Sequence, residues 1–270
     1  MRKLTIMVTM IGLLPTAALA QECQTYLNKT PQLISIDDAL ALFADVTEKG
    51  EFESTEQYRT RISAATQNHG PLVIEKPIDN SQLVYDADHQ YFRIGRHLFD
   101  NENMPIQLLW MYDGPFPQKY RPRDGSIDVV IRSEEKITGT YQASNAFGAS
   151  TEVLKIDRIQ WGVYDRPVEF SGGTTLASSS LVPISEGEDY LGTLPMSSAE
   201  ARRFKESAKI AIAVIPKAPW RIHYRKSTPY QATIHNPKEV TSVLNILFAD
   251  IKCALLLDSS NTVVSAFTTR

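Results

Sequence analysis

Three cationic side chains alternate along one predicted strand and give the sequence its most specific candidate for binding chemistry. Arg221, His223 and Arg225 occupy every second position of the segment 220–226, so all three project from one face of a strand. Guanidinium groups bind planar anions through paired hydrogen bonds, which makes a phosphate, a carboxylate or an anionic glycan the expected ligand if this row lines a groove. The alternative is a solvated outer face of a sheet.

The aromatic and basic segment 110–123 is a second candidate. Its prolines cannot donate hydrogen bonds to a strand ladder, so most of the segment is predicted as a loop. Trp110, Tyr120 and Arg121 have the side chains that stack on a sugar or on a proline-rich peptide. The alternative is that these rings pack against the core of their own domain.

Local motifs for catalysis and for metal binding are missing from the sequence. The five histidines are scattered without a helical pair, so no metal site and no cofactor are predicted. Ser133 and Lys136 match the Ser-x-x-Lys pattern, but the Lys-Thr-Gly strand that should accompany it is absent. The sequence therefore favours a protein that is not an enzyme. The alternative is a hydrolase whose site is assembled from distant residues.

The first twenty residues have the layout of a secretory signal peptide. Arg2 and Lys3 precede an apolar run, and Ala18 and Ala20 provide the small residues of a cleavage site after position 20. We therefore expect a signal peptide over 1–20, a single globular domain over 21–270 and a periplasmic or secreted product. No later segment is long and apolar enough to predict a membrane span.

Charge and cysteine content agree with export. Removing Arg2 and Lys3 with the signal peptide changes the formal net charge from -3 to -5, and this mild acidity argues against a nucleic-acid partner. Thiols are oxidised outside the cytoplasm, so the two cysteines, Cys23 and Cys253, are predicted to form a disulfide. The alternative is a pair of free thiols, one buried and one on a loose terminus.

Three capped segments predict short helices. Ser35 is an N-cap for a helix over 36–48, Ser54 with Gln57 forms a capping box for one within 51–62, and Ser197 starts a third that ends near residue 208. Each of them carries apolar residues on one face. The helix over 36–48 is expected to dock on the sheet.

Alternating apolar residues predict the sheet. Hairpins are expected over 83–94, 137–164 and 249–267, with a central strand over 209–215 whose small residues should lie close under a helix. Further strands are expected over 220–226 and 230–235, and a phase slip at Asp157 and Arg158 predicts a bulge. The fold class is therefore α+β, with a mainly antiparallel curved sheet and about three short helices.

Two short motifs resemble sequences of uncharacterised exported bacterial proteins. One is Glu-Phe-Glu-Ser-Thr over 51–55 followed by Tyr58 and Arg61, and the other is Asn-Ala-Phe-Gly over 145–148 preceded by Tyr141. The resemblance implies a bacterial envelope setting and a mixed helix and sheet fold. It brings no activity and no catalytic residues.

Export, the fold class and the missing catalytic motifs lead to one functional hypothesis. The chain is predicted to be a periplasmic, non-enzymatic binding or accessory protein of the bacterial cell envelope. Its expected partner is an anionic glycan or an envelope protein. A secreted hydrolase is the alternative, and a structural part of a larger envelope complex is a third possibility.

Overall fold

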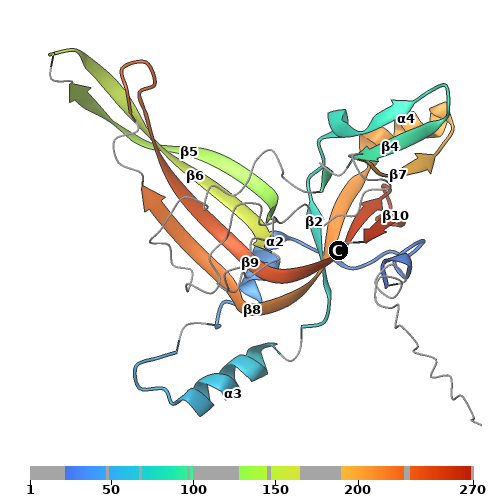
Figure 1. The fold of residues 1–270 in the computed structure, drawn as a ribbon, viewed down its shortest axis with the longest axis horizontal. Coiled ribbons are helices and arrows are strands. Elements are labelled where there is room, and N and C mark those ends of the chain that lie inside the picture. The colour runs from blue at the N-terminus through green and yellow to red at the C-terminus, as the bar shows by residue number, and fades with distance from the viewer. Residues whose placement is uncertain are drawn as a thin grey trace, which may run out of the picture.

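The structure, a computed structural model, describes residues 22–46, 49–66, 69–95, 98–99, 128–144, 147–164, 190–227 and 232–268. The predicted signal peptide lies outside these residues. In chain order the elements are β1 (Leu33–Ile34), α2 (Ile36–Ala41), α3 (Thr55–Thr66), β2 (Leu72–Lys76), the 3₁₀ helix η1 (Asn80–Gln82), β3 (Val84–Asp86), β4 (Tyr91–Gly95), β5 (Asp128–Ser144), β6 (Ser150–Tyr164), β7 (Tyr190–Pro195), α4 (Ser198–Ser207), β8 (Lys209–Ser227), β9 (Lys238–Leu257) and β10 (Val263–Thr268) (Figure 1). None of these helices is long and apolar enough to cross a bilayer.

A large curled sheet dominates the molecule, with the order β1-β2-β8-β9-β6-β5 and with β10 paired to β9 (Figure 1). The predicted mixture of helices and a curved sheet is confirmed, but the sheet is mixed, because β6 runs parallel to β9 and β1 runs parallel to β2. Parallel neighbours need a long connection. The chain between β6 and β9 provides one, since it contains β7, α4 and β8.

The predicted hairpin over 249–267 closes this sheet as the last part of β9 and the strand β10. The side chain of Asp258 accepts hydrogen bonds from the backbone of Ser260 and Thr262, which forms the turn between the two strands. The central strand predicted over 209–215 is also confirmed, because β8 lies between β2 and β9.

Cys23 and Cys253 form the predicted disulfide. The bond fixes the start of the described chain against the face of the sheet that carries Ala211 and Ala213. We predicted that a helix covers these small residues. The covering layer is instead a single helical turn at 22–24 with the segment that follows it, because a disulfide to the centre of the sheet leaves room only for closely packed backbone.

A second sheet, of order β3-β4-β7, packs with α4 against one end of β8 and β9 (Figure 1). Phe92 of β4 contacts Phe204 of α4, and both are buried together with Ile210 and Leu256 of the long strands. The β3-β4 hairpin was predicted from the sequence. The long strands β8 and β9 therefore contribute to two separate cores.

Helix α2 lies on one face of the large sheet, where Phe43 is fully buried among side chains of β2, β6, β8 and β9. Ser35 accepts a hydrogen bond from the backbone of Asp38, as expected for an N-cap. Regular helix ends at Ala41 rather than near residue 48. The backbone bonds that follow span three residues, such as the one from Val46 to Phe43, and this tighter turn keeps Phe43 in the core.

The other two helices begin at their predicted caps. Ser54 and Gln57 exchange the two hydrogen bonds of a capping box before α3, and Ser197 and Glu200 do so before α4. Helix α3 lies apart from the large sheet (Figure 1), and Ile62 is its one buried residue among those with a described exposure. Helix α4 is integrated in a core, whereas α3 is tied to the segment after α2 by a hydrogen bond from Arg61 to the carbonyl oxygen of Asp45 at 3.0 Å.

Three predicted strand features are wrong in detail. The strands expected over 209–215 and 220–226 are one strand, β8. Its register with β9 shifts between Ala213 and Val214 and again between Pro216 and Arg221, where Trp220 has a positive φ of 62°. Residues 232–237 are not part of a strand. The bulge expected at Asp157 is absent there, because the register shifts of the β5-β6 pair lie on β5, next to residues 131 and 138.

Candidate functional site

A pocket of about 290 Å³, here called the α2 pocket, lies between α2 and the sheet face that α2 covers. Its walls combine residues of four elements, and those that carry polar or aromatic groups are Asp37, Trp161, Arg221, His223 and Asn245. Strand pairing explains the arrangement. His223 of β8 faces Asn245 of β9, which in turn faces Trp161 of β6, so the three side chains share one row across the sheet.

Arg221 lies one row closer to α2 than His223. Its guanidinium group donates one hydrogen bond, from Nη1 to the carbonyl oxygen of Leu40 at 3.3 Å, near the C-terminal end of α2. Among the described residues no carboxylate forms an ion pair with it. His223 hydrogen bonds through Nδ1 to Oδ1 of Asn245 at 2.8 Å, which fixes the imidazole ring at the wall of the pocket.

Trp161 and Arg132 complete the site, and we did not predict a role for either from the sequence. The guanidinium carbon of Arg132 lies 3.9 Å from the centre of the Trp161 ring, in a cation–π contact. The same guanidinium pairs with Asp37 at 2.9 Å and with Glu134 at 3.1 Å. These contacts fix the start of α2 to β5, and they give the Asp37 carboxylate Arg132 as its ion-pair partner.

Arg225, the third member of the predicted row, has a different environment. Its two terminal nitrogens donate to the two carboxylate oxygens of Asp157 at 2.8 and 3.0 Å, and Asp157 is only 7% exposed. Arg225 does not line the α2 pocket. The structure therefore brings Arg221 and His223 to the pocket and assigns Arg225 to an ion pair. Trp110, Tyr120 and Arg121 lie outside the described residues.

The strand row was predicted either to line a groove or to form a solvated outer face. Arg221 and His223 line the α2 pocket on the face that α2 covers, and a ligand for the row stays a prediction. The contributions of Trp161 and Arg132 come from strands that are distant in the sequence. In the sequence, a tryptophan that follows polar residues on a predicted strand was a signal for Trp161, and we find no local signal for Arg132.

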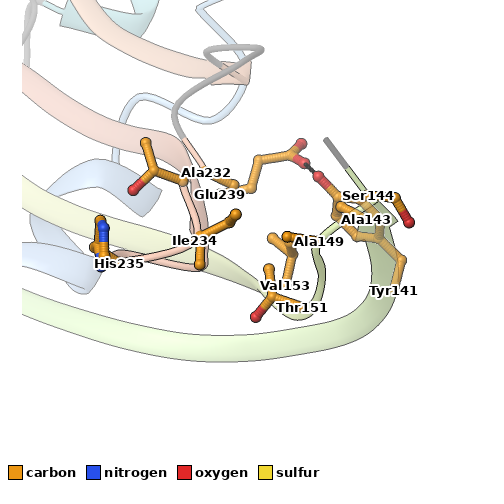
Figure 2. A pocket seen from close by; sticks show the side chains of 11 residues that line it. Tyr141, Ala143, Ser144, Ala149, Thr151, Val153, Ala232, Ile234, His235 and Glu239 are labelled. Carbon is orange, nitrogen blue, oxygen red and sulfur yellow. Dashed lines mark hydrogen bonds between the residues drawn. The ribbon is translucent and has the colours of Figure 1, made fainter. Parts of the chain in front are cut away.

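A second and larger pocket, of about 710 Å³, lies at the far end of the large sheet and is here called the tip pocket (Figure 2). The end of the β5-β6 hairpin forms one wall, and the segment before β9 forms the other. The Tyr141 hydroxyl donates to Oε2 of Glu239 at 3.0 Å. This bond to a carboxylate stabilises the protonated phenol and raises the pKa of Tyr141 above its ordinary value.

The tip pocket also bears on the hydrolase alternative, because its walls include histidine, carboxylate and hydroxyl groups. Among the described residues no hydrogen bond joins His235 to Glu239, and Figure 2 shows their side chains apart. Ser144 is hydrogen bonded to Ser150 at 2.8 Å instead. Nor do the described parts of the chain contain a group of three side chains placed to hold a metal ion.

The motif around Glu53 has a structural explanation. Arg61 donates to both oxygens of Glu53 at 2.9 Å and lies over the Tyr58 ring at 5.4 Å, so the motif ties the start of α3 to its second turn. Hydrogen bonds from Arg61 lower the pKa of Glu53 to about 2. Phe52, also in the motif, is 94% exposed and contributes nothing to this contact.

Comparisons with known proteins add no further candidate residues. The chain matches no family model, no curated protein and no solved structure. Its function is therefore argued from the geometry of the α2 pocket and the tip pocket.

Proposed function

We propose that this protein is an exported, non-enzymatic binding protein of the cell envelope that holds a small anionic ligand in its α2 pocket. One observation carries the proposal. The Arg221 guanidinium lines the pocket with one hydrogen bond to a backbone carbonyl and without a carboxylate partner among the described residues. Guanidinium donors that are not neutralised recognise carboxylates and phosphates.

The rest of the pocket supports a planar or ring-shaped anion. Trp161 presents a ring that is fixed by the Arg132 contact, and such a surface stacks on sugar rings and aromatic acids. His223 and Asn245 add polar groups close by. A volume of about 290 Å³ is at the lower end for small-molecule sites, so the ligand is one sugar acid or one aromatic acid rather than a chain.

The location in the envelope rests on the sequence and on the disulfide. The signal peptide over 1–20 predicts export, and a disulfide between Cys23 and Cys253 is typical of proteins in an oxidising compartment. Expression in bacteria followed by osmotic shock tests the prediction. The released protein should begin at Gln21, and a chain that stays in the cytoplasm with residue 1 intact would refute export.

Calorimetric titration tests the ligand class directly. Glucuronate, benzoate and inorganic phosphate are the probes, with glucose and benzyl alcohol as uncharged controls of similar shape. We expect at least one of the three anions to bind with a Kd of about 1 mM or lower, and glucose and benzyl alcohol to bind about tenfold more weakly than glucuronate and benzoate, respectively, where these bind. If none of the anions binds, the proposed function is wrong.

Substitution of Arg221 assigns the binding to the pocket. Arg221→Met should weaken anion binding about tenfold, and Arg221→Lys should retain part of it because the charge remains. Arg202→Met makes the same chemical change on an exposed position of α4 and should leave binding unchanged. Thermal unfolding of each variant checks that α2 stays docked. Equal affinity of Arg221→Met and the unchanged protein would contradict the proposal.

A further inference from the structure

The tip pocket has a chemical character opposite to that of the α2 pocket. Tyr141, Val153 and Ile234 line it with apolar surface, and Glu239 places a carboxylate in the same wall (Figure 2). Its volume of about 710 Å³ is within the range of small-molecule sites. The pocket adjoins the hairpin turn that carries Phe147, which is 95% exposed.

Glu239 is held in place by neutral donors. It accepts from the Tyr141 hydroxyl at 3.0 Å and from the Ser227 hydroxyl at 3.3 Å. Within the described residues no lysine, arginine or histidine lies within ion-pair distance of this carboxylate. Its carboxylate therefore has a fixed orientation and remaining acceptor capacity.

Two titratable groups near Glu239 bear on the charge of the pocket. Lys155 faces Glu239 in the register of β6 and β9, but its ammonium group lies over the Tyr141 ring, 5.1 Å from the ring centre. His235 lines the pocket from the opposite wall. Lys155 thus shows that the Tyr141 ring attracts an ammonium group, and it reduces the negative potential at Glu239 without pairing to it.

We propose that the tip pocket binds a small organic ammonium ion, an amine carried on an aromatic or aliphatic body. The carboxylate of Glu239 accepts hydrogen bonds from the ammonium group, and the Tyr141 ring provides a cation–π surface. Val153 and Ile234 contact the apolar body. This site is independent of the proposed anion site, so either can fail without affecting the other.

Protein-observed NMR titration of the folded mature chain tests the proposal. The probe is phenethylamine, and 2-phenylethanol and methylamine are controls that remove the charge and the apolar body, respectively. We expect phenethylamine to bind with a Kd in the millimolar range or lower and each control to bind about tenfold more weakly. Equal binding of 2-phenylethanol would show that the pocket does not recognise the ammonium group, which would contradict the proposal. Absence of phenethylamine binding would also overturn it.

Variants of the two charged residues give opposite expected results. Glu239→Gln should weaken phenethylamine binding about tenfold, whereas Lys155→Gln should strengthen it about twofold by removing a neighbouring positive charge. Glu152→Gln removes an exposed carboxylate of β6, the strand of Lys155, outside the pocket. It should have no effect on binding. Thermal unfolding confirms that each variant folds. Unchanged binding by Glu239→Gln would contradict the assignment.

Discussion

The arginines of the large sheet differ in what faces their guanidinium groups. Arg225 is paired with Asp157, whose side chain is almost buried, whereas Arg158 is paired with the half-exposed Glu135. Arg221 faces the α2 pocket, and its partner within the described part of the chain is a backbone carbonyl. These three arginines therefore have different roles although their side chains are identical. Measurements of stability can distinguish the buried ion pair from the exposed one.

Removing the ion-pair partner of a buried carboxylate should lower the free energy of unfolding more than removing the partner of an exposed carboxylate. Arg225→Met should lower the free energy of unfolding by about 2 kcal/mol, because the buried Asp157 carboxyl group loses both of its Arg225 hydrogen bonds. Arg158→Met, the matched control, should cost less than about 1 kcal/mol. Urea unfolding measures both, and equal costs would contradict the ranking.

The ion pair of Glu53 and Arg61 predicts a pH dependence. The pKa of Glu53 is lowered from 4.5 to about 2, so the folded state binds this proton less tightly than the unfolded state does. The stabilisation is fully present above pH 4.5 and is lost as the pH falls through about 2. A carboxyl NMR titration should place the Glu53 midpoint near pH 2.

Arg61→Met should return the Glu53 midpoint toward 4.5, because the first cause of the shift is the Arg61 hydrogen bond. Asp86 provides an internal control in the same titration. Hydrogen bonds from the His89 backbone and ring lower the pKa of Asp86, and Arg61 contributes nothing to that contact. A Glu53 midpoint that does not move in the variant would show that the ion pair does not form in solution.

At the scale of elements, α3 and α4 share a cap motif but differ in packing. Phe204 and Ala201 of α4 are buried in the core that includes the small sheet, whereas α3 buries Ile62 alone among its residues with a described exposure. Loss of a cap should therefore have different consequences in the two helices. It should lower the free energy of global unfolding for the helix that is packed in a core, and it should only increase local opening in the other.

Cap removal tests this difference. Ser197→Ala should lower the free energy of unfolding by about 1 kcal/mol, because it removes the hydroxyl that accepts from the Glu200 backbone, while the bond from the Ser197 backbone to the Glu200 carboxylate can remain. Ser54→Ala should leave the melting temperature nearly unchanged and speed hydrogen exchange within α3. Ser207→Ala makes the same change at the other end of α4, away from the cap, and is the control for replacing serine by alanine in this helix. A global destabilisation by Ser54→Ala would show that α3 is docked.

At the scale of the whole molecule, β8 and β9 connect every core cluster. Their outer halves form the floor of the α2 pocket and extend toward the tip pocket, and their inner halves pack against the small sheet and the N-terminal segment. The irregularity between Pro216 and Arg221 lies between the two halves. The β8-β9 pair thus contributes to every core cluster although its register shifts twice, between Ala213 and Val214 and between Pro216 and Arg221.

The disulfide acts on this whole-molecule scale because 230 residues separate its cysteines. Chain-entropy arguments give a stabilisation of about 5 kcal/mol for so long a loop as an upper value. Reduction, or the double variant Cys23→Ser with Cys253→Ser, should lower the melting temperature strongly and by the same amount. The unfolded, unreduced protein should show no reactive thiol. Two titratable thiols would refute the bond.

Local patterns in the sequence were sufficient for the caps, the hairpins and the disulfide. Ser35, Ser54 and Ser197 act on backbone groups within three residues, so their roles follow from spacing alone. The cysteine pairing followed because only two cysteines exist and export was predicted. The length of α2 was overestimated, since the core position of Phe43 decides where the helix tightens.

Long-range contacts decided the rest. The alternation at 221–225 placed three cations on one face, but only the β6-β9 register brings Asp157 to Arg225 and leaves Arg221 beside α2. The parallel pairing of β6 and β9 has no local signal, because it depends on which strand edges meet after a long connection. The sequence by itself therefore determined the elements and the residue types available for binding, while the tertiary structure decided which charges are neutralised and which face a pocket.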